Sequence, residues 1–208
     1  MVMFIIAILL AYLIGSIPTS YIIGRLKKGI DIRSYGSGNV GATNTLRVLG
    51  KKMGILALFI DMAKGAFCVI VLTALFYNSQ LHMSLYVFKV YLAAFAVFGH
   101  IWTVFLRFKG GKGIATSCGV ALALIPIPAL IAISVCICVI SLSKYVSLGS
   151  LVMMASLPFL VVLFKQPNPY LILFITLLLA TSYTHKENIK RLLSGKESKI
   201  TKKNDPTG

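Results

Sequence analysis

The sequence predicts an all-α integral membrane protein with seven transmembrane helices, and three observations predict it. Of the 208 residues, 58% are apolar and 12% are charged, with a mean hydropathy of +0.89, whereas a soluble domain has about a quarter charged residues. The apolar residues form runs long enough to cross a bilayer. The cations, which give a net charge of +16, gather between alternate runs. A basic nucleic-acid-binding tail would not be this apolar, so we expect no nucleic-acid partner.

Each apolar run is compared with the roughly 20 residues that a helix needs to cross about 30 Å of hydrocarbon. The runs that fit or nearly fit are 1–24, 54–77, 83–106, 146–164 and 170–183. A longer apolar stretch, 113–143, is interrupted by Pro126 and Pro128, which predicts two short helices joined at the prolines. Both are shorter than the bilayer requires, so two crossings and a re-entrant hairpin remain open; two crossings give seven spans.

The first run resembles a signal peptide, but we interpret it as a retained helix. It has no basic residues before the apolar run, is about 24 residues long, and is followed by Arg25, Lys27 and Lys28. Its N-terminus is expected outside the cell.

The distribution of Lys and Arg predicts the orientation of the other helices, because cytoplasmic loops carry the excess of cations. Most of the 21 Lys and Arg residues follow the first, third and fifth spans or lie in the C-terminal segment. Counting 113–143 as one span would place that cationic segment outside. The predicted protein therefore has a cytoplasmic C-terminus, glycine-rich cytoplasmic loops and a short amphipathic interfacial helix. Residues 1–193 are expected to form one transmembrane domain, and 194–208 a polar flexible tail.

Two of the cytoplasmic loops are rich in glycine, at 35–44 and 109–113. Glycines allow successive backbone N–H groups to converge on an anion, and a helix that begins beside them adds its positive end. Arg47 and Lys112 add full charges to the same kind of ligand. The loops therefore predict two phosphate sites, or one phosphate held from two sides. The alternative is that they are turns carrying topogenic charges.

Two further polar segments are expected on the same side, at 143–147 and 185–191. His185 and Asn188 are separated by three residues and share a face if the helix continues, so both can point into one cleft. A single histidine at a membrane boundary is more often an interfacial hydrogen-bonding residue. The neighbouring polar residues favour the cleft.

The remaining polar residues within apolar runs have mostly structural interpretations. Asp61 and Lys64 lie on one helix face, and we interpret them as a structural ion pair. His100 either orients the second glycine loop or is a packing residue with a satisfied hydrogen bond, and both alternatives stay open. The 4 cysteines lie within apolar helices without ligand spacing, so we predict buried thiols and no metal site.

Taken in order, these motifs resemble the bacterial acyl-phosphate:glycerol-3-phosphate acyltransferases. The matching stretches are SGNVGATN at 37–44 with Arg47, DMAKG at 61–65, FKGGKGIAT at 108–116 after His100, KYVS at 144–147, and HKENI at 185–189 with Arg191. The similarity extends over about residues 1–197.

The resemblance implies a multi-pass enzyme of the bacterial inner membrane with its active site on the cytoplasmic face. Such an enzyme transfers a fatty acyl group from acyl phosphate to the 1-hydroxyl of sn-glycerol 3-phosphate. The products are lysophosphatidic acid and phosphate, in the first step of phospholipid biosynthesis. The implied partners are the two substrates, the lipid bilayer and the soluble enzyme that makes acyl phosphate; no cofactor is expected.

The resemblance also implies roles for individual residues. The residues expected to bind glycerol 3-phosphate are Ser37, Arg47, Lys112, His185 and Asn188. Of these, Ser37, Lys112 and His185 are the catalytic candidates. The residues expected to form the acyl-phosphate loop are Gly110, Gly111, Gly113 and Thr116. The residues expected to support the site are Asn39, Thr43, Asn44, His100 and Ser147.

The mechanism we expect is direct attack by the glycerol hydroxyl, because acyl phosphate carries a good leaving group and the enzyme needs to supply little beyond orientation and charge neutralisation. The chain has no GxSxG elbow and no His followed four residues later by Asp. The proton goes to a substrate phosphate oxygen or to His185, while N–H groups of 110–113 and Lys112 stabilise the departing phosphate. The alternative function is a transporter of phosphate esters or anions. Polar residues gathered on one side disfavour that alternative.

Overall fold

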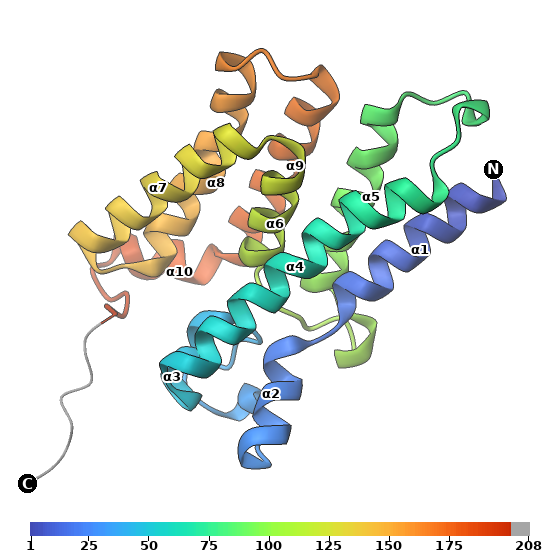
Figure 1. Ribbon diagram of the computed structural model, residues 1–208. Coiled ribbons are helices and arrows are strands. Elements are labelled where there is room, and N and C mark those ends of the chain that lie inside the picture. Colours follow the sequence, from blue (N-terminus) through green and yellow to red (C-terminus); the bar gives the residue numbers. More distant parts are fainter. Residues whose placement is uncertain (201–208) are drawn as a thin grey trace, which may run out of the picture.

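The computed structural model describes residues 1–200, and in that range the chain is helical, without β-strands (Figure 1). The α-helices, in order, are α1 Val2–Ser16, α2 Thr19–Lys28, α3 Ala42–Leu49, α4 Lys51–Phe76, α5 Leu85–Ile101, α6 Ile114–Leu124, α7 Pro126–Ser143, α8 Val146–Leu163, α9 Asn168–Thr184 and α10 Lys186–Leu193. Short 3₁₀ turns lie at Ile32–Ser34, Ser79–Leu81 and Val104–Leu106. The all-α class predicted from the sequence is confirmed.

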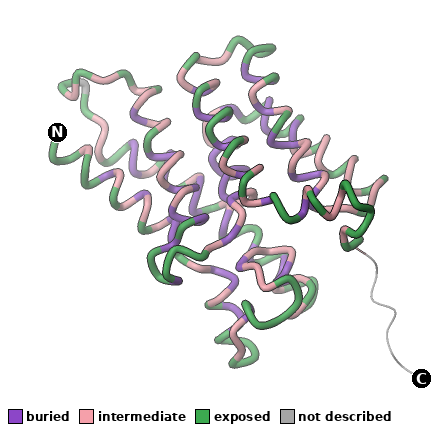
Figure 2. Tube along the Cα trace, turned by 180° about the vertical axis from the view of Figure 1, so that it is seen from behind, coloured by how far each residue is buried: buried purple, intermediate pink, exposed green. Residues whose placement is uncertain are grey.

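Five stretches are long and apolar enough to cross a membrane. They are Val2–Lys28, Lys51–Phe76, Leu85–Leu106, Pro126–Ser143 and Val146–Leu163. The shorter apolar helices α6 and α9 complete the set of runs expected from the sequence, and α6 meets α7 at the predicted proline break. Figure 2 shows buried positions facing the inside of the bundle and exposed positions facing outward. Because large apolar side chains such as Leu75 and Phe159 are exposed there, the outer surface is suited to lipid.

The first apolar run is broken, where the sequence predicted one continuous helix. Pro18 separates α1 from α2, since proline has no N–H to donate and disfavours helical geometry at Ile17. The break frees backbone carbonyls in an apolar setting, and side chains from elsewhere in the chain satisfy them. The Thr103 hydroxyl donates to the Ser16 carbonyl at 2.5 Å, and the Lys64 ammonium donates to the Ile17 carbonyl at 3.0 Å. The break is thereby tied to α4 and to the loop after α5.

Close contact between α4 and α6 fixes the start of α6. A Cβ atom added at Gly65 would collide with the Thr116 carbonyl, and one at Gly119 would collide with the Met62 carbonyl. The two backbones therefore touch through glycine, as small residues permit between membrane helices. This contact anchors the second glycine loop, which runs directly into α6.

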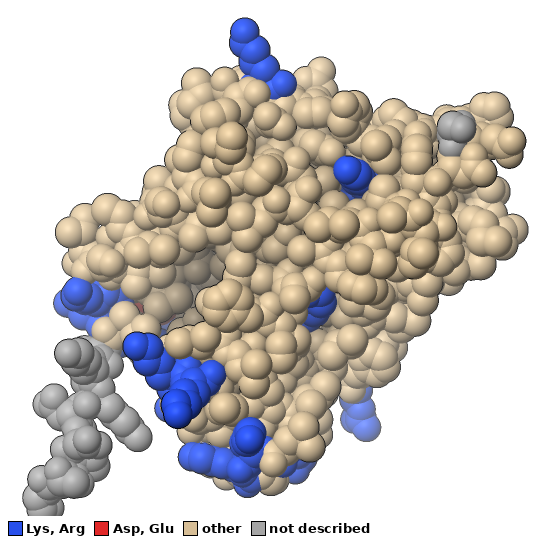
Figure 3. Space-filling view, in the orientation of Figure 1, with Lys and Arg blue, Asp and Glu red and all other residues tan. Residues whose placement is uncertain are grey.

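The polar segments share one end of the bundle, the lower end in Figure 1, where α2, α3 and α10 lie. Lys and Arg side chains cluster at that end in Figure 3. After α10 the chain turns at Gly195, in the left-handed region with φ +68°, and the Ile200 N–H donates to the Lys144 carbonyl at 2.8 Å. Residues 195–200 of the expected flexible tail thus return to the bundle. The rest of that tail, 201–208, lies outside the described residues.

Candidate active site

The first glycine loop is organised by Asn44, one of the predicted supporting residues. Its buried carboxamide accepts a hydrogen bond from the Ser37 N–H at 2.8 Å and donates to the Ile32 and Tyr35 carbonyls at 3.2 and 3.1 Å. Gly36 adopts a left-handed conformation, with φ +60°, which allows the turn. One side chain therefore fixes the path of the loop, while Ser37 itself is exposed.

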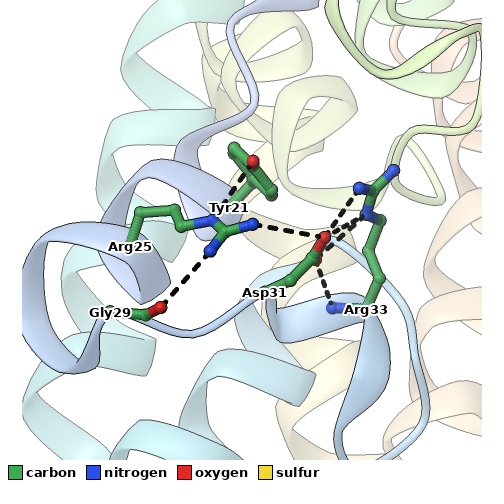
Figure 4. A network of polar contacts seen from close by, with 5 residues as sticks. All are labelled: Tyr21, Arg25, Gly29, Asp31 and Arg33. Atoms are coloured by element: carbon green, nitrogen blue, oxygen red, sulfur yellow. Dashed lines mark hydrogen bonds and ion pairs between the residues drawn. The ribbon is translucent and has the colours of Figure 1, made fainter.

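The start of this loop is held by a surface network around Asp31 (Figure 4). Its carboxylate accepts from the Arg33 side chain at 2.7 Å and from the Arg33 N–H at 3.0 Å, and Arg25 lies 3.9 Å away. Both guanidinium groups also lie against the Tyr21 ring. The Arg33 hydrogen bonds lower the pKa of Asp31 to about 2, so the carboxylate stays charged over the physiological range.

The second glycine loop differs from the arrangement expected from the sequence. The Gly110 N–H donates to the Ile101 carbonyl and the Gly111 N–H to the His100 carbonyl, both at 3.0 Å, so neither is free for an anion. Within residues 1–200, the N–H groups of 112–116 form no hydrogen bond. They surround the N-terminus of α6, where Gly113 is the cap with φ +87°. The backbone donors still available to an anion therefore lie at the positive end of α6, two residues later than predicted.

Lys112 reaches from this loop to α10. Its ammonium donates to the Asn188 side-chain oxygen, and its carbonyl accepts from the Thr184 hydroxyl at 3.1 Å. Burial lowers the pKa of Lys112 to about 8; Glu197 opposes this effect, while the positive charges of Arg191 and Arg47 add to it. Lys112 remains mostly protonated at pH 7, close to other cations, and such a group attracts anions.

His185 is buried at the junction of α9 and α10. Its Nδ1 lies 2.8 Å from the Thr181 carbonyl, and because a carbonyl only accepts, Nδ1 carries the proton. This leaves Nε2 with a free lone pair. Burial and the charge of Lys112 lower the pKa of His185 to about 4. The ring is therefore neutral at pH 7, and Nε2 is a hydrogen-bond acceptor of low basicity.

Glu197 contacts the candidate site residues Asn188 and Ser147, although the sequence predicted that it lies in the flexible tail. Its carboxylate accepts from Ser147 at 2.7 Å, from the Asn188 NH₂ at 2.6 Å and from Arg191 at 2.7 Å. Burial acts to raise its pKa, but these hydrogen bonds lower it on balance. The sequence offered one signal for Glu197: the chain has only 5 acidic residues, so each of them is a candidate for a specific role. A chain of hydrogen bonds thus runs from Glu197 through Asn188 to Lys112.

The predicted residues fall into two groups. Lys112, His185, Asn188 and Ser147 form one cluster around Glu197. The other group comprises Ser37, Asn39, Thr43, Asn44 and Arg47, which lie on the first loop and α3.

The two groups adjoin, because a Cβ atom added at Gly111 would lie 2.8 Å from the Val40 carbonyl. Arg47 is close enough to lower the pKa of Lys112. Thr116, in contrast, is fully buried against α4 and not on the open side of the loop. Figure 3 shows the surface hollowed near this end, with Lys and Arg beside the hollow.

The fold and the site together define a polytopic helical membrane protein with a cation-lined polar site at one end. The family model for glycerol-3-phosphate acyltransferase matches residues 5–195. A glycerol-3-phosphate acyltransferase 2 from Moorella thermoacetica is 43% identical, covering 95% of this chain and 98% of that protein. A glycerol-3-phosphate acyltransferase from Chlorobaculum parvum is 39% identical, with 97% and 98% covered.

Two solved structures have the same fold. Both are crystal structures of PlsY, an integral membrane glycerol 3-phosphate acyltransferase, one in a glycerol 3-phosphate form and one in a lysophosphatidic acid form. Their TM-scores are 0.87 and 0.85, each at 36% identity and 95% coverage of this chain. The matched regions cover 96% and 95% of the two PlsY chains, respectively. The chain belongs to the glycerol-3-phosphate acyltransferase family.

Proposed function

We propose that this protein transfers a fatty acyl group from acyl phosphate to the 1-hydroxyl of glycerol 3-phosphate, yielding lysophosphatidic acid and inorganic phosphate in the first step of phospholipid biosynthesis. The observation that carries the proposal is the cluster of Lys112, His185 and Asn188 beside the N–H groups at the start of α6, which have no hydrogen-bond partner within residues 1–200. In a glycerol-3-phosphate acyltransferase, this cluster supplies a cation and backbone donors for phosphate together with a neutral base.

The proposed reaction is a direct displacement without an acyl-enzyme. The glycerol hydroxyl oxygen forms a bond to the acyl carbonyl carbon, the bond between that carbon and the phosphate oxygen breaks, and phosphate leaves with the electron pair. The hydroxyl proton passes to a substrate phosphate oxygen or to Nε2 of His185. Lys112 and the N–H groups at the start of α6 stabilise the departing phosphate. Ser37, Arg47 and Asn188 hold glycerol 3-phosphate.

We further propose seven membrane crossings, with α6 and α9 completing the five longer spans. The distribution of Lys and Arg supports an orientation in which α2, α3 and α10 lie at the cytoplasmic face of the bacterial inner membrane. Both substrates then arrive from the cytoplasm, the acyl phosphate from the soluble enzyme that makes it. The lipid product leaves sideways into the bilayer, which explains why the reaction needs a membrane protein.

The test is an assay of detergent-purified protein with acyl phosphate and glycerol 3-phosphate, measuring released phosphate and lysophosphatidic acid together. Equal amounts of both products are expected. The absence of turnover would overturn the proposed function. Acyl-labelled donor separates the mechanisms, since a covalently labelled protein would exclude direct displacement. A His185→Ala variant that keeps substantial turnover would identify the substrate phosphate as the proton acceptor.

A further inference from the structure

A buried charge cluster lies beneath the second glycine loop, and the reaction proposed above does not use it. The Lys64 ammonium on α4 has three acceptors: the Asp61 carboxylate at 2.8 Å, the Ile17 carbonyl at 3.0 Å and Nδ1 of His100 at 3.0 Å. Asp61 also accepts from the Thr19 hydroxyl at 2.8 Å. All of these side chains are buried. The cluster joins the α1–α2 break to α4 and to the end of α5.

The number of N–H donors on Lys64 determines which tautomer His100 adopts. An ammonium has three N–H donors and no acceptor, and Lys64 has three partners. The contact with His100 is therefore a donation from Lys64 to Nδ1, which requires an unprotonated Nδ1. The single ring proton of the neutral imidazole then lies on Nε2. An ion pair between Asp61 and Lys64 alone would not fix this tautomer.

The Nε2 side of His100 faces the place where the two glycine loops meet. A Cβ atom added at Gly111 would collide with Nε2 and would lie 2.8 Å from the Val40 carbonyl. A small cavity at this junction is lined by Ser16, Thr19, Val40, His100, Thr103 and Gly111, among others. The His100 carbonyl also accepts from the Gly111 N–H. His100 thus contacts the second loop through both its ring and its backbone.

We propose that Lys64 is a positioning residue, whose ammonium holds His100 in the neutral Nε2–H tautomer and thereby fixes the second glycine loop against the first. The cluster goes beyond charge neutralisation, because the third N–H of Lys64 is directed to a histidine that packs on the loop. The loop in turn carries Lys112 and the start of α6. Lys64 acts on the site through His100 and touches no substrate.

The direct test is ¹⁵N NMR of the histidine side chains in the full-length protein. The chain has 3 histidines, so a His100→Gln variant assigns the signals. The wild-type protein is expected to show His100 neutral, with its proton on Nε2. The variant for comparison is Asp61→Asn with Lys64→Met, which removes both charges together because a single substitution would leave a buried unpaired charge. There, His100 is expected to lose the single-tautomer signature.

The matched control is Thr73→Val, which alters a buried hydroxyl on the same helix, α4, and should leave the His100 signals unchanged. A wild-type His100 that is protonated or carries its proton on Nδ1 would overturn the proposal. So would a double variant with unchanged His100 signals. These readouts do not depend on the enzyme's activity.

A kinetic measurement tests the consequence for the loop, and it rests on the proposed function. The double variant is expected to raise KM for acyl phosphate about tenfold while KM for glycerol 3-phosphate changes less than about twofold. Thr73→Val should change neither constant. Equal increases in the two KM values would indicate general damage to the fold and would refute the positioning role of Lys64. Absent turnover in the wild-type protein would refute the proposed function and leave the NMR result standing.

Discussion

The protein contains two polar clusters, one buried and one partly buried, that differ in how many of their hydrogen-bonding groups already have protein partners. Around Lys64, every N–H of the ammonium has a protein acceptor. Around Lys112, the ammonium has one hydrogen-bond partner within residues 1–200, the Asn188 oxygen, and the adjacent N–H groups of 112–116 form no hydrogen bond in that range. A closed cluster holds helices together, whereas an open cluster retains the capacity to bind. The difference predicts a supporting role for the buried Lys64 and a binding role for the half-buried Lys112.

The largest effect is expected from removing the charge of the open cluster. Lys112→Met should lower kcat/KM by about 10²–10³-fold, because it removes a preorganised cation from the departing phosphate. The control is Lys51→Met, since Lys51 is an exposed lysine at the start of α4 and should keep its activity. Steady-state assays of both variants measure the difference. Similar losses in the two would mean that general cationic charge at this end, and not the open cluster, governs turnover.

The contrast also shows what the sequence predicts well. Apolar periodicity and length predict most of the helices, and Pro126 correctly separates α6 from α7. Pro18 breaks the first helix unexpectedly, because in a membrane such a break needs donors from distant residues, here Thr103 and Lys64. No local pattern reports those partners.

The candidate site was predictable in its residue types but not in its connections. The i, i+3 spacing places His185 beside Asn188, and glycine content marks both loops. Neither the spacing nor the glycine content reveals that the N–H groups of Gly110 and Gly111 donate to carbonyls at the end of α5. Glu197 was missed because polar composition alone resembles a disordered tail, and only the folded chain brings its carboxylate to Asn188.

The next largest effect is expected at the acidic end of the open cluster. Glu197→Gln should lower kcat/KM by about tenfold, because the neutral amide no longer accepts strongly from Asn188 and Arg191. It should also shift the pH profile. Glu197 raises the pKa of Lys112, which is about 8; without the carboxylate that pKa falls, so activity that needs protonated Lys112 is lost at a lower pH as pH rises.

The shift of the pH profile distinguishes an effect of Glu197 on the charge of Lys112 from an effect of Glu197 on folding. The control is Glu187→Gln, which neutralises an exposed acid in the first turn of α10 and should leave the alkaline limb in place. If Glu197→Gln lowers activity equally at every pH, Glu197 supports the fold without setting the charge of Lys112.

A smaller and local effect is expected at the first glycine loop, which is closed by side chains of its own. Asn44→Ala should accelerate amide exchange at Ser37 by about tenfold or more, because the Ser37 N–H loses its acceptor and two carbonyls lose a buried donor. Hydrogen exchange read by mass spectrometry measures this. The start of α9, compared in the same experiment, should be unchanged. Exchange that rises equally throughout the chain would show that Asn44 stabilises the whole fold and not the loop.

The smallest effect is expected at Asp31, where the network is at the surface and water screens it. Asp31→Asn should lower the melting temperature by no more than about 2 °C. The sign of its pH dependence follows from its pKa of about 2, which lies below the ordinary aspartate pKa of 3.8. A depressed carboxylate pKa stabilises the fold above the unfolded pKa, and that contribution is lost only as pH falls towards 2. The difference between variant and wild type should therefore be constant from pH 5 to pH 8. A difference that grows within this window would mean that a neighbouring group, and not Asp31, titrates in the network. The network that holds the start of the first glycine loop would then change its charge near pH 7, as the open cluster around Lys112 is expected to do.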